Sequence, residues 1–151
     1  MNTKLLTSLF TSNAGLSALV LRGPVGIVLA AHGAQKLFAW FGGYGLEGTG
    51  QYMESIGLAP GFLMALLAGS AEFFGGLALV LGVLTRPAAL VSAFTMLMAI
   101  FTAHISNGLF LSNGGYEYAL ALFAATLSLV FSGAGRLAVD NLIANKFASA
   151  Q

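Results

Sequence analysis

Long apolar stretches separated by short polar connections dominate this chain. Four of them, about residues 17–41, 61–84, 87–106 and 116–133, match the roughly 20 residues that a helix needs to cross the hydrocarbon core of a bilayer. The pattern predicts one all-α membrane domain over residues 1–151, an up-down-up-down bundle of four transmembrane helices.

The connections between these stretches indicate how the helices are joined. Residues 42–60 are rich in glycine and contain a candidate short interfacial helix at about residues 47–56. Only Thr85-Arg86-Pro87 separates the second and third stretches, so those two helices must be antiparallel neighbours. The polar and apolar residues after 135 predict a second short interfacial helix at the C-terminus.

Composition agrees with a membrane protein and excludes several functions. The chain is 58% hydrophobic and 7% charged, whereas a soluble domain has about 25% charged residues. A net charge of +1 gives no basic field for nucleic acid. The absence of cysteine excludes thiol chemistry and thiolate-bound iron–sulfur clusters, so a redox role needs an electron carrier from outside the chain.

Basic residues predict the orientation in the membrane. With four spans, every lysine and arginine outside the first helix's outer end falls on one side, which should be cytoplasmic by the positive-inside rule. Both termini are therefore expected in the cytoplasm, and the first and third connections on the opposite side of the membrane. The residues that set this expectation are Lys4, Arg22, Arg86, Arg136 and Lys146.

Glu72 is the single ionisable residue in the apolar stretch 61–84. A charge at the centre of a membrane helix costs roughly 2.5 to 3.5 kcal/mol on insertion scales, so a carboxyl group at this depth is a functional-site hypothesis. The alternative is a protonated carboxyl that forms a structural hydrogen bond between helices.

Depth estimates indicate a partner for Glu72 on the first helix. From the rise per residue, Glu72 lies about 16 Å and His32 about 13 Å from the outer helix ends, with Lys36 at about 7 Å. His32 is therefore the expected neighbour of Glu72. Lys36 lies four residues from His32 and so on the same helix face, although its side chain could instead extend to the headgroups.

Further polar residues gather at the outer ends of the other helices. His104, Asn107 and Glu117 all fall there, which predicts a polar pocket in the outer half of the bundle. A structural reading stays open for each: Glu117 could reach the headgroups, and His104 could be satisfied by a helix carbonyl or by Asn107.

Arg22 is expected to be structural, either extending to the cytoplasmic face or closing a network within its helix. We expect no metal site, because the depths of His32 and His104 differ by about 10 Å.

Several motifs resemble the DoxX family of small bacterial membrane proteins. They are LRGPVGIVLAAHGAQKLFAWFGG, AEFFGGLALVLGVLTRPAAL, AHISNGLF and GGYEYALAL, and the likeness covers about residues 20–140. The resemblance implies a four-helix fold in the inner membrane and a link to oxidoreduction, including subunits of thiosulfate:quinone oxidoreductases. The matching positions are Arg22, His32, Gln35, Lys36, Glu72, Arg86, His104 and Glu117.

The leading functional hypothesis is a membrane oxidoreductase component that binds a quinone. Glu72 and His32 would relay protons, as the catalytic groups. Arg22 and Arg86 would be structural, and no covalent cofactor is expected. The quinone would be bound by Lys36, Gln35, His104, Asn107 and Glu117.

Two other functions stay open at this point. One is a transporter or binding protein for a small molecule, with Glu72 as a proton-coupled switch. The other is a noncatalytic membrane anchor for soluble redox enzymes, in which the loops and Arg86 would matter more. The expected partners are the lipid bilayer, soluble redox subunits and further copies of the chain, with no nucleic acid.

Overall fold

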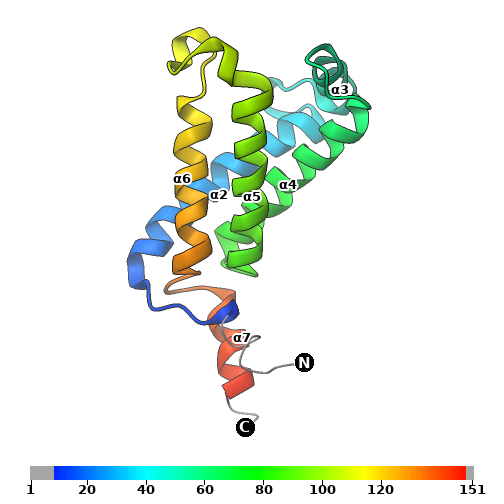
Figure 1. Cartoon of the computed structure of the whole chain (residues 1–151). Helices are drawn as coiled ribbons and strands as arrows, with labels where there is room; N and C mark the ends of the chain where they lie inside the picture. Colours follow the sequence, from blue (N-terminus) through cyan, green and yellow to red (C-terminus); the bar gives the residue numbers. More distant parts are fainter. Residues whose placement is uncertain (1–8, 149–151) are drawn as a thin grey trace.

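The computed structural model describes residues 9–148, and it contains helices and no strand within that range. This confirms the all-α prediction for the described part of the chain. Figure 1 shows the helices in order: α2 (Gly15–Phe38), α3 (Gly45–Ser55), α4 (Gly61–Leu81), α5 (Thr85–Ala99), α6 (Glu117–Ser132) and α7 (Val139–Ala148).

Three helical stretches are long and apolar enough to cross a membrane: Gly15–Phe38, Gly61–Leu81 and Thr85–Asn107. The last comprises α5, a π-helical turn at Ile100–His104 and a 3₁₀ turn at Ile105–Asn107. Helix α6 is apolar but has only 16 residues. The fourth membrane crossing therefore stays a prediction, although α6 packs along α5 as a bundle helix would.

The helices form two antiparallel pairs that meet at an angle. Helix α2 packs on α4, α5 packs on α6, and the short turn at residues 82–84 joins α4 to α5, so these two are neighbours as expected. Figure 1 shows the pairs diverging toward α3 and the α5–α6 connection, which we call the loop end. The opposite end, where α7 lies, is the terminal end.

Two helix boundaries differ from the sequence prediction for a local reason. Helix α2 ends at Phe38 rather than at residue 41 because Ala39 adopts a left-handed conformation with φ of 58°. Helix α4 ends at Leu81 rather than at residue 84, since Gly82 forms a left-handed cap with φ of 65°. The predicted short helices are present as α3 and α7, while their placement at a membrane interface stays a prediction.

Glycines bring α2 and α4 into direct backbone contact. A Cβ atom on Gly26 would lie 2.6 Å from the carbonyl oxygen of Gly76, and one on Gly33 would lie 2.7 Å from that of Gly69. Any side chain at these positions would push the helices apart. Because lipid supplies no hydrophobic force between helices, such close van der Waals packing is a main source of their association.

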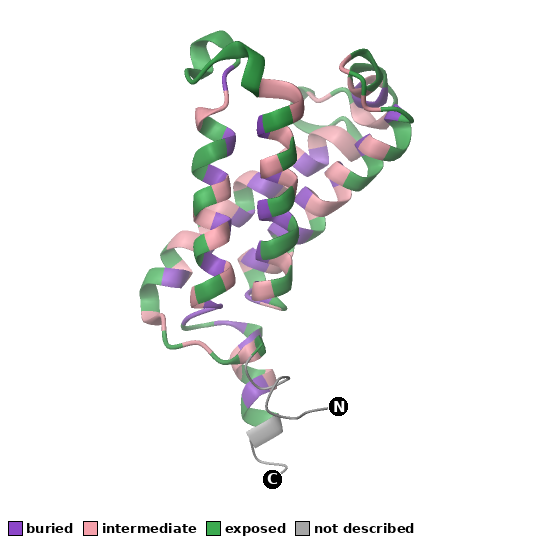
Figure 2. Ribbon diagram, in the orientation of Figure 1, coloured by how far each residue is buried: buried purple, intermediate pink, exposed green. Residues whose placement is uncertain are grey.

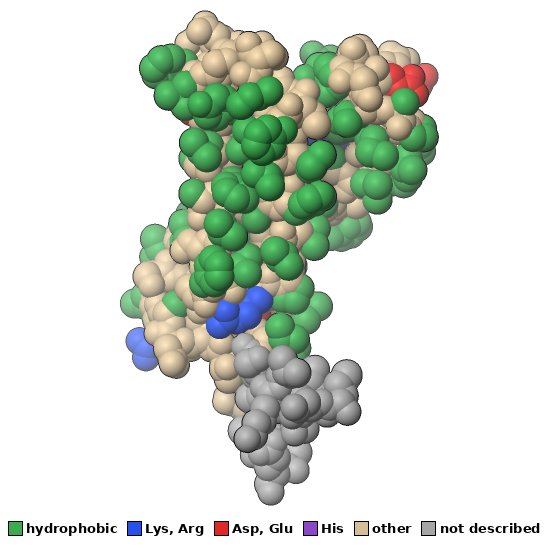
Figure 3. Space-filling model, in the orientation of Figure 1, with side chains coloured by type: hydrophobic (Ala, Val, Ile, Leu, Met, Phe, Trp, Pro, Cys, Tyr) green, Lys and Arg blue, Asp and Glu red, His purple; other side chains and the backbone are tan. Residues whose placement is uncertain are grey.

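The outer surface of the bundle is apolar, as a bilayer requires. Figure 2 shows exposed residues along the outward faces of the helices, and Figure 3 shows that many of these side chains are hydrophobic. Val20 is 71% exposed and Phe131 is 75% exposed, whereas the core residues Leu29, Leu79 and Leu129 are all 0% exposed. This arrangement places apolar side chains both inside the bundle and against lipid.

Arg22 is buried at the terminal end of the bundle, with 0% of its surface exposed. It neither extends to the surface nor closes a network within its own helix, because its hydrogen-bond acceptors lie on other segments. Its guanidinium group donates to the backbone oxygens of Leu79 (2.8 Å), Val80 (2.5 Å), Ala134 (3.0 Å), Arg136 (3.4 Å) and Leu137 (2.6 Å). The expected structural role is thus a clamp that ties α2 to the end of α4 and to the segment after α6.

Arg86 and Asp140 form further hydrogen bonds at the terminal end. Arg86 donates to the last carbonyl groups of α6, those of Val130 and Phe131, each at 2.6 Å. The carboxylate of Asp140, which is 1% exposed, accepts from the backbone N–H groups of Leu84 (2.7 Å) and Thr85 (2.9 Å) at the start of α5. Helix α7 is thereby fixed to the bundle.

Candidate functional site

A cavity of about 940 Å³ lies between the two helix pairs and extends toward the loop end. Ligand pockets in proteins commonly measure about 300–1,000 Å³, so this volume suits an organic molecule. Figure 3 shows the molecule hollowed between its two lobes at the loop end. Most lining residues are apolar, and the ionisable ones are His32, Lys36, Tyr52, Glu72, His104 and Tyr118.

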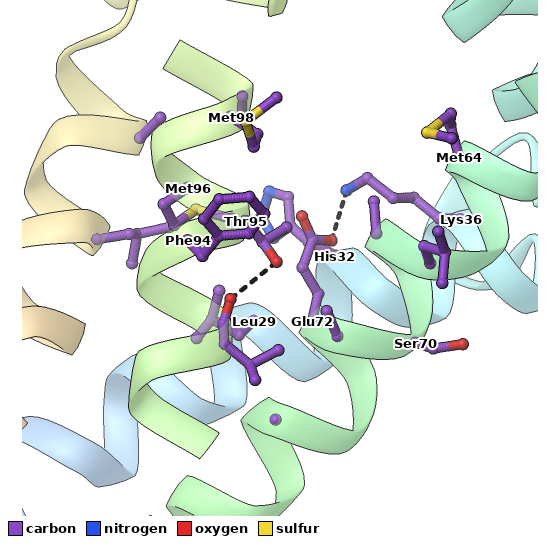
Figure 4. Close-up of a pocket in the computed structure, with 18 of the residues that line it drawn as sticks. Leu29, His32, Lys36, Met64, Ser70, Glu72, Phe94, Thr95, Met96 and Met98 are labelled. Carbon is purple, nitrogen blue, oxygen red and sulfur yellow. Dashed lines mark hydrogen bonds and ion pairs between the residues drawn. The ribbon is translucent and has the colours of Figure 1, made fainter. Parts of the chain in front are cut away.

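An ion pair between Lys36 and Glu72 forms part of the cavity wall. The Nζ atom of Lys36 donates to Oε2 of Glu72 at 2.6 Å, and the two side chains are 25% and 5% exposed (Figure 4). Glu72 was expected beside His32, but its charged contact is Lys36. The depth estimate used backbone positions alone, whereas the long and flexible lysine side chain reaches back along the helix.

His32 lies on the other side of the Glu72 carboxylate in Figure 4. Its Nδ1 atom is 3.0 Å from the backbone oxygen of Val28, and since a carbonyl only accepts, Nδ1 carries the proton. Within the described residues, Nε2 has no hydrogen-bond partner. The ring packs against Tyr118 with centroids 5.7 Å apart. His32 thus presents a free basic nitrogen in a fixed ring orientation.

His104 lines the loop end of the same cavity, at the last residue of the π-helical turn. Turns of this kind are frequent at functional sites because they re-aim side chains within a helix. Its Nδ1 atom donates to the backbone oxygen of Gly114 at 2.8 Å, and the side chain of Asn107 donates to the same oxygen at 3.3 Å. His104 therefore has the same protonated nitrogen as His32.

Three of the predicted site residues do not line the cavity; they hold loop turns instead. Gln35 donates to the backbone oxygen of Phe41 at 3.3 Å, and Glu117 accepts from the backbone N–H of Leu111 at 2.6 Å. Asn107 is exposed and bonds Gly114, as described above. The structure therefore brings together Glu72, Lys36, His32 and His104, and leaves Gln35, Asn107 and Glu117 outside the cavity.

Some residues that line the cavity are not predicted by the sequence patterns. Tyr118 is not among the predicted site residues, but it lines the cavity and contacts His32. Its position one residue after Glu117, at the start of α6, was the signal that could have indicated this. Thr49, Tyr52 and Met53 of α3 also line the cavity, and the glycine-rich sequence around them gave no such signal.

The fold and the site define a class: a helical membrane protein with a mostly apolar, ligand-sized cavity whose wall contains a partly buried ion pair. The chain belongs to the DoxX family, whose profile matches residues 17–105. This match covers nearly all of the three long helical stretches and includes Lys36 and Glu72.

Curated relatives agree with this assignment. The chain is 33% identical over 128 residues to "Putative oxidoreductase CatD" of Bacillus subtilis (strain 168), an alignment that covers 85% of this chain and 87% of the relative. It is 38% identical over 109 residues to "Inner membrane protein YqjF" of Escherichia coli (strain K12), covering 68% and 78% of the two chains. No solved structure matches the chain.

Proposed function

We propose that this protein is an oxidoreductase component of the bacterial cytoplasmic membrane and that its cavity binds a quinone-like molecule. The observation that carries the proposal is the Lys36–Glu72 ion pair on the wall of a mostly apolar cavity. The relative named as an oxidoreductase supports the class of activity. The proposal includes four membrane crossings with both termini in the cytoplasm.

The donor groups in the cavity suit the two carbonyl oxygens of a quinone. The ammonium group of Lys36 has three N–H donors and the carboxylate of Glu72 accepts one of them, so others remain for a ligand oxygen. Tyr118 contributes a hydroxyl group on the same wall as His32. The surrounding apolar side chains would enclose the flat ring, while these few polar groups would fix its orientation.

Reduction of a quinone to a quinol takes two electrons and two protons. Glu72, as a carboxylate, and the bare Nε2 atom of His32 would each accept a proton that comes from water and pass it to a ring oxygen, so that the two groups relay the two protons. The electrons would come from a separate donor, such as a soluble redox subunit, because the chain has no cysteine with which to hold them as a dithiol or an iron–sulfur cluster.

The distribution of charged side chains supports an orientation of the cavity relative to the two sides of the membrane. Figure 3 shows basic side chains at the terminal end of the face in view and acidic ones at the loop end. By the positive-inside rule the terminal end would be cytoplasmic, and the ion pair and both histidines would then lie in the outer half of the membrane.

Glu72→Gln and Lys36→Met test the proposal, with Glu117→Gln as the matched control. Glu117→Gln makes the same chemical change as the first variant but lies outside the cavity. The measurement is the binding of a decyl-tailed 1,4-benzoquinone to the full chain in lipid nanodiscs, followed by its reduction with a soluble donor. Hydrogen bonds to charged groups contribute about 1.5–3 kcal/mol, so we expect binding to Lys36→Met at least 10-fold weaker than to the wild type.

The outcomes are distinct. Loss of reduction in Glu72→Gln and of binding in Lys36→Met, with Glu117→Gln unchanged, supports the proposal. Unchanged binding and turnover in both cavity variants would refute it. If Glu72→Gln instead abolishes proton-coupled uptake into vesicles while quinone binding is retained, the protein is a transporter.

A further inference from the structure

The cavity is an elongated slot between α4 and α5. Its lining residues extend along α4 from Met64 to Ala78, and along α5 and the π-helical turn that follows it from Pro87 to Thr102. At 1.5 Å per residue, each of these runs is about 20 Å long, most of the thickness of a hydrocarbon core. The slot is therefore much longer than the ring of a quinone.

Polarity is distributed unevenly along the slot. The polar lining side chains lie level with Glu72 or nearer to the loop end, and they include Lys36, His104 and Tyr118. On the terminal side of Glu72 only apolar residues line the slot, and two of them, Ala78 and Ala88, are small. At Gly75 the two helices meet, because a Cβ atom there would lie 2.7 Å from Oγ of Ser92. The residues of this apolar half include Phe74, Gly75, Ala78, Leu84, Pro87, Ala88 and Val91.

The slot is open along its side. Phe74 of α4 and Val91 and Phe94 of α5 line the slot and are also exposed on the outer face, by 61%, 50% and 62%. In a membrane, exposed apolar faces of spanning helices contact lipid chains. The opening therefore leads into the hydrocarbon rather than into water.

We infer that the apolar half of the slot holds the hydrocarbon tail of an amphiphilic ligand, which enters sideways from the bilayer and places its polar head at the Lys36–Glu72 ion pair. This inference rests on the proposed function and specifies its substrate class as tailed, lipid-soluble quinones. A tail gains little free energy by leaving lipid for an equally apolar slot. The slot acts by steric admission: the ring reaches the ion pair only while its tail lies in the slot, so a side chain that fills the slot excludes a tailed ligand.

Two variants place a large side chain in the slot and so test the inference. A third variant, at a neighbouring residue that does not line the slot, is the control. Ala88→Phe occupies the floor, and Val91→Trp blocks the rim at an exposed position where a large side chain does not disturb the core. Leu90→Trp is the control, because Leu90 is 57% exposed but does not line the slot. Each protein, as the full chain in nanodiscs, is titrated with a decyl-tailed benzoquinone and with the same ring bearing a methyl group, both expressed as mole fraction in the bilayer.

We expect Ala88→Phe and Val91→Trp to bind the decyl probe at least 10-fold more weakly than the wild type does, with the methyl probe and Leu90→Trp unchanged. Equal losses for both probes, or no loss for either, overturn the tail site while the proposed function stands. A wild-type protein that binds neither probe refutes the proposed function and this inference with it.

A second copy of the chain is the competing occupant of the slot. Since the chain has no cysteine, Val91→Cys provides a single thiol at the rim. Disulfide-linked dimers of this variant in native membranes would show that another protomer covers the slot and would overturn the inference. Labelling of the same thiol by a lipid-soluble maleimide, blocked by the decyl probe, supports it.

Discussion

Glu72 and Lys36 hold opposite charges in contact inside a largely apolar cavity. Removing two charges from water costs several kcal/mol per ion, and their mutual attraction offsets this only when the geometry is good. The contact of 2.6 Å meets that condition, and Lys36 retains partial exposure that lowers its desolvation cost. Either residue alone would be an unpaired charge among apolar side chains.

A double-mutant cycle tests this pairing at the residue scale. We expect Lys36→Met and Glu72→Leu each to lower the free energy of unfolding by about 3 kcal/mol, because each leaves the other group unpaired. The double variant should recover most of this loss, since an apolar pair of similar volume is often neutral or stabilising. Thermal unfolding in detergent provides the measurement. Strictly additive losses would show that the two side chains do not depend on each other.

The sequence identified Glu72 because a lone carboxyl in an apolar stretch has a clear physical cost. It did not identify Lys36 as the partner, because the pairing depends on how closely α2 and α4 approach and on how the lysine side chain folds back. Asp140 was missed for a similar reason. It lies in a stretch of mixed polarity that suggests a surface helix, and only the packing of α7 buries it against the start of α5.

Helix α2 presents two kinds of glycine, and the difference provides a prediction at the element scale. Gly33 packs against the α4 backbone, whereas a Cβ atom on Gly23 would meet nothing within 4 Å. We expect Gly33→Leu to lower the free energy of unfolding by about 3 kcal/mol, because overpacking forces the backbones apart. Gly23→Ala should be neutral or should stabilise the helix by up to about 1 kcal/mol.

Unfolding of both glycine variants by a denaturing detergent measures the contrast. If Gly33→Leu unfolds at the same detergent fraction as the wild type, the close approach of α2 and α4 is not a main source of stability. Gly23→Ala serves as the control for changes in helix propensity alone.

The apolar pattern predicts where the four long helices lie. It does not predict the π-helical turn or the angle between the two helix pairs. The four apolar stretches correspond to α2, α4, α5 with its extension, and α6. The π-helical turn that aims His104 into the cavity leaves no signature in hydrophobic periodicity. Nor does a one-dimensional pattern show that the two helix pairs diverge, and it is this divergence that creates the cavity.

The number of membrane crossings is a property of the whole molecule. It is four if α6 crosses the membrane and three if α6 does not. The cysteine-free chain permits single-cysteine labelling with a membrane-impermeant maleimide. Ser112 and Arg136 are both exposed and lie on opposite sides of α6 in the sequence. We expect Ser112→Cys to label in intact spheroplasts and Arg136→Cys to label only after permeabilisation, because a crossing α6 puts them on opposite faces. Labelling of both from one side would mean three crossings.

The clamp around Arg22 has a consequence for the biosynthesis of the chain. Two of its acceptors, the carbonyl groups of Ala134 and Leu137, lie 112 and 115 residues further along the sequence. At about 5–20 residues per second, roughly 6 to 23 s pass between the synthesis of Arg22 and that of Leu137. During this interval the first helix carries a guanidinium group with part of its hydrogen bonding unmet. A segment that is synthesised after α6 therefore completes the anchoring of α2.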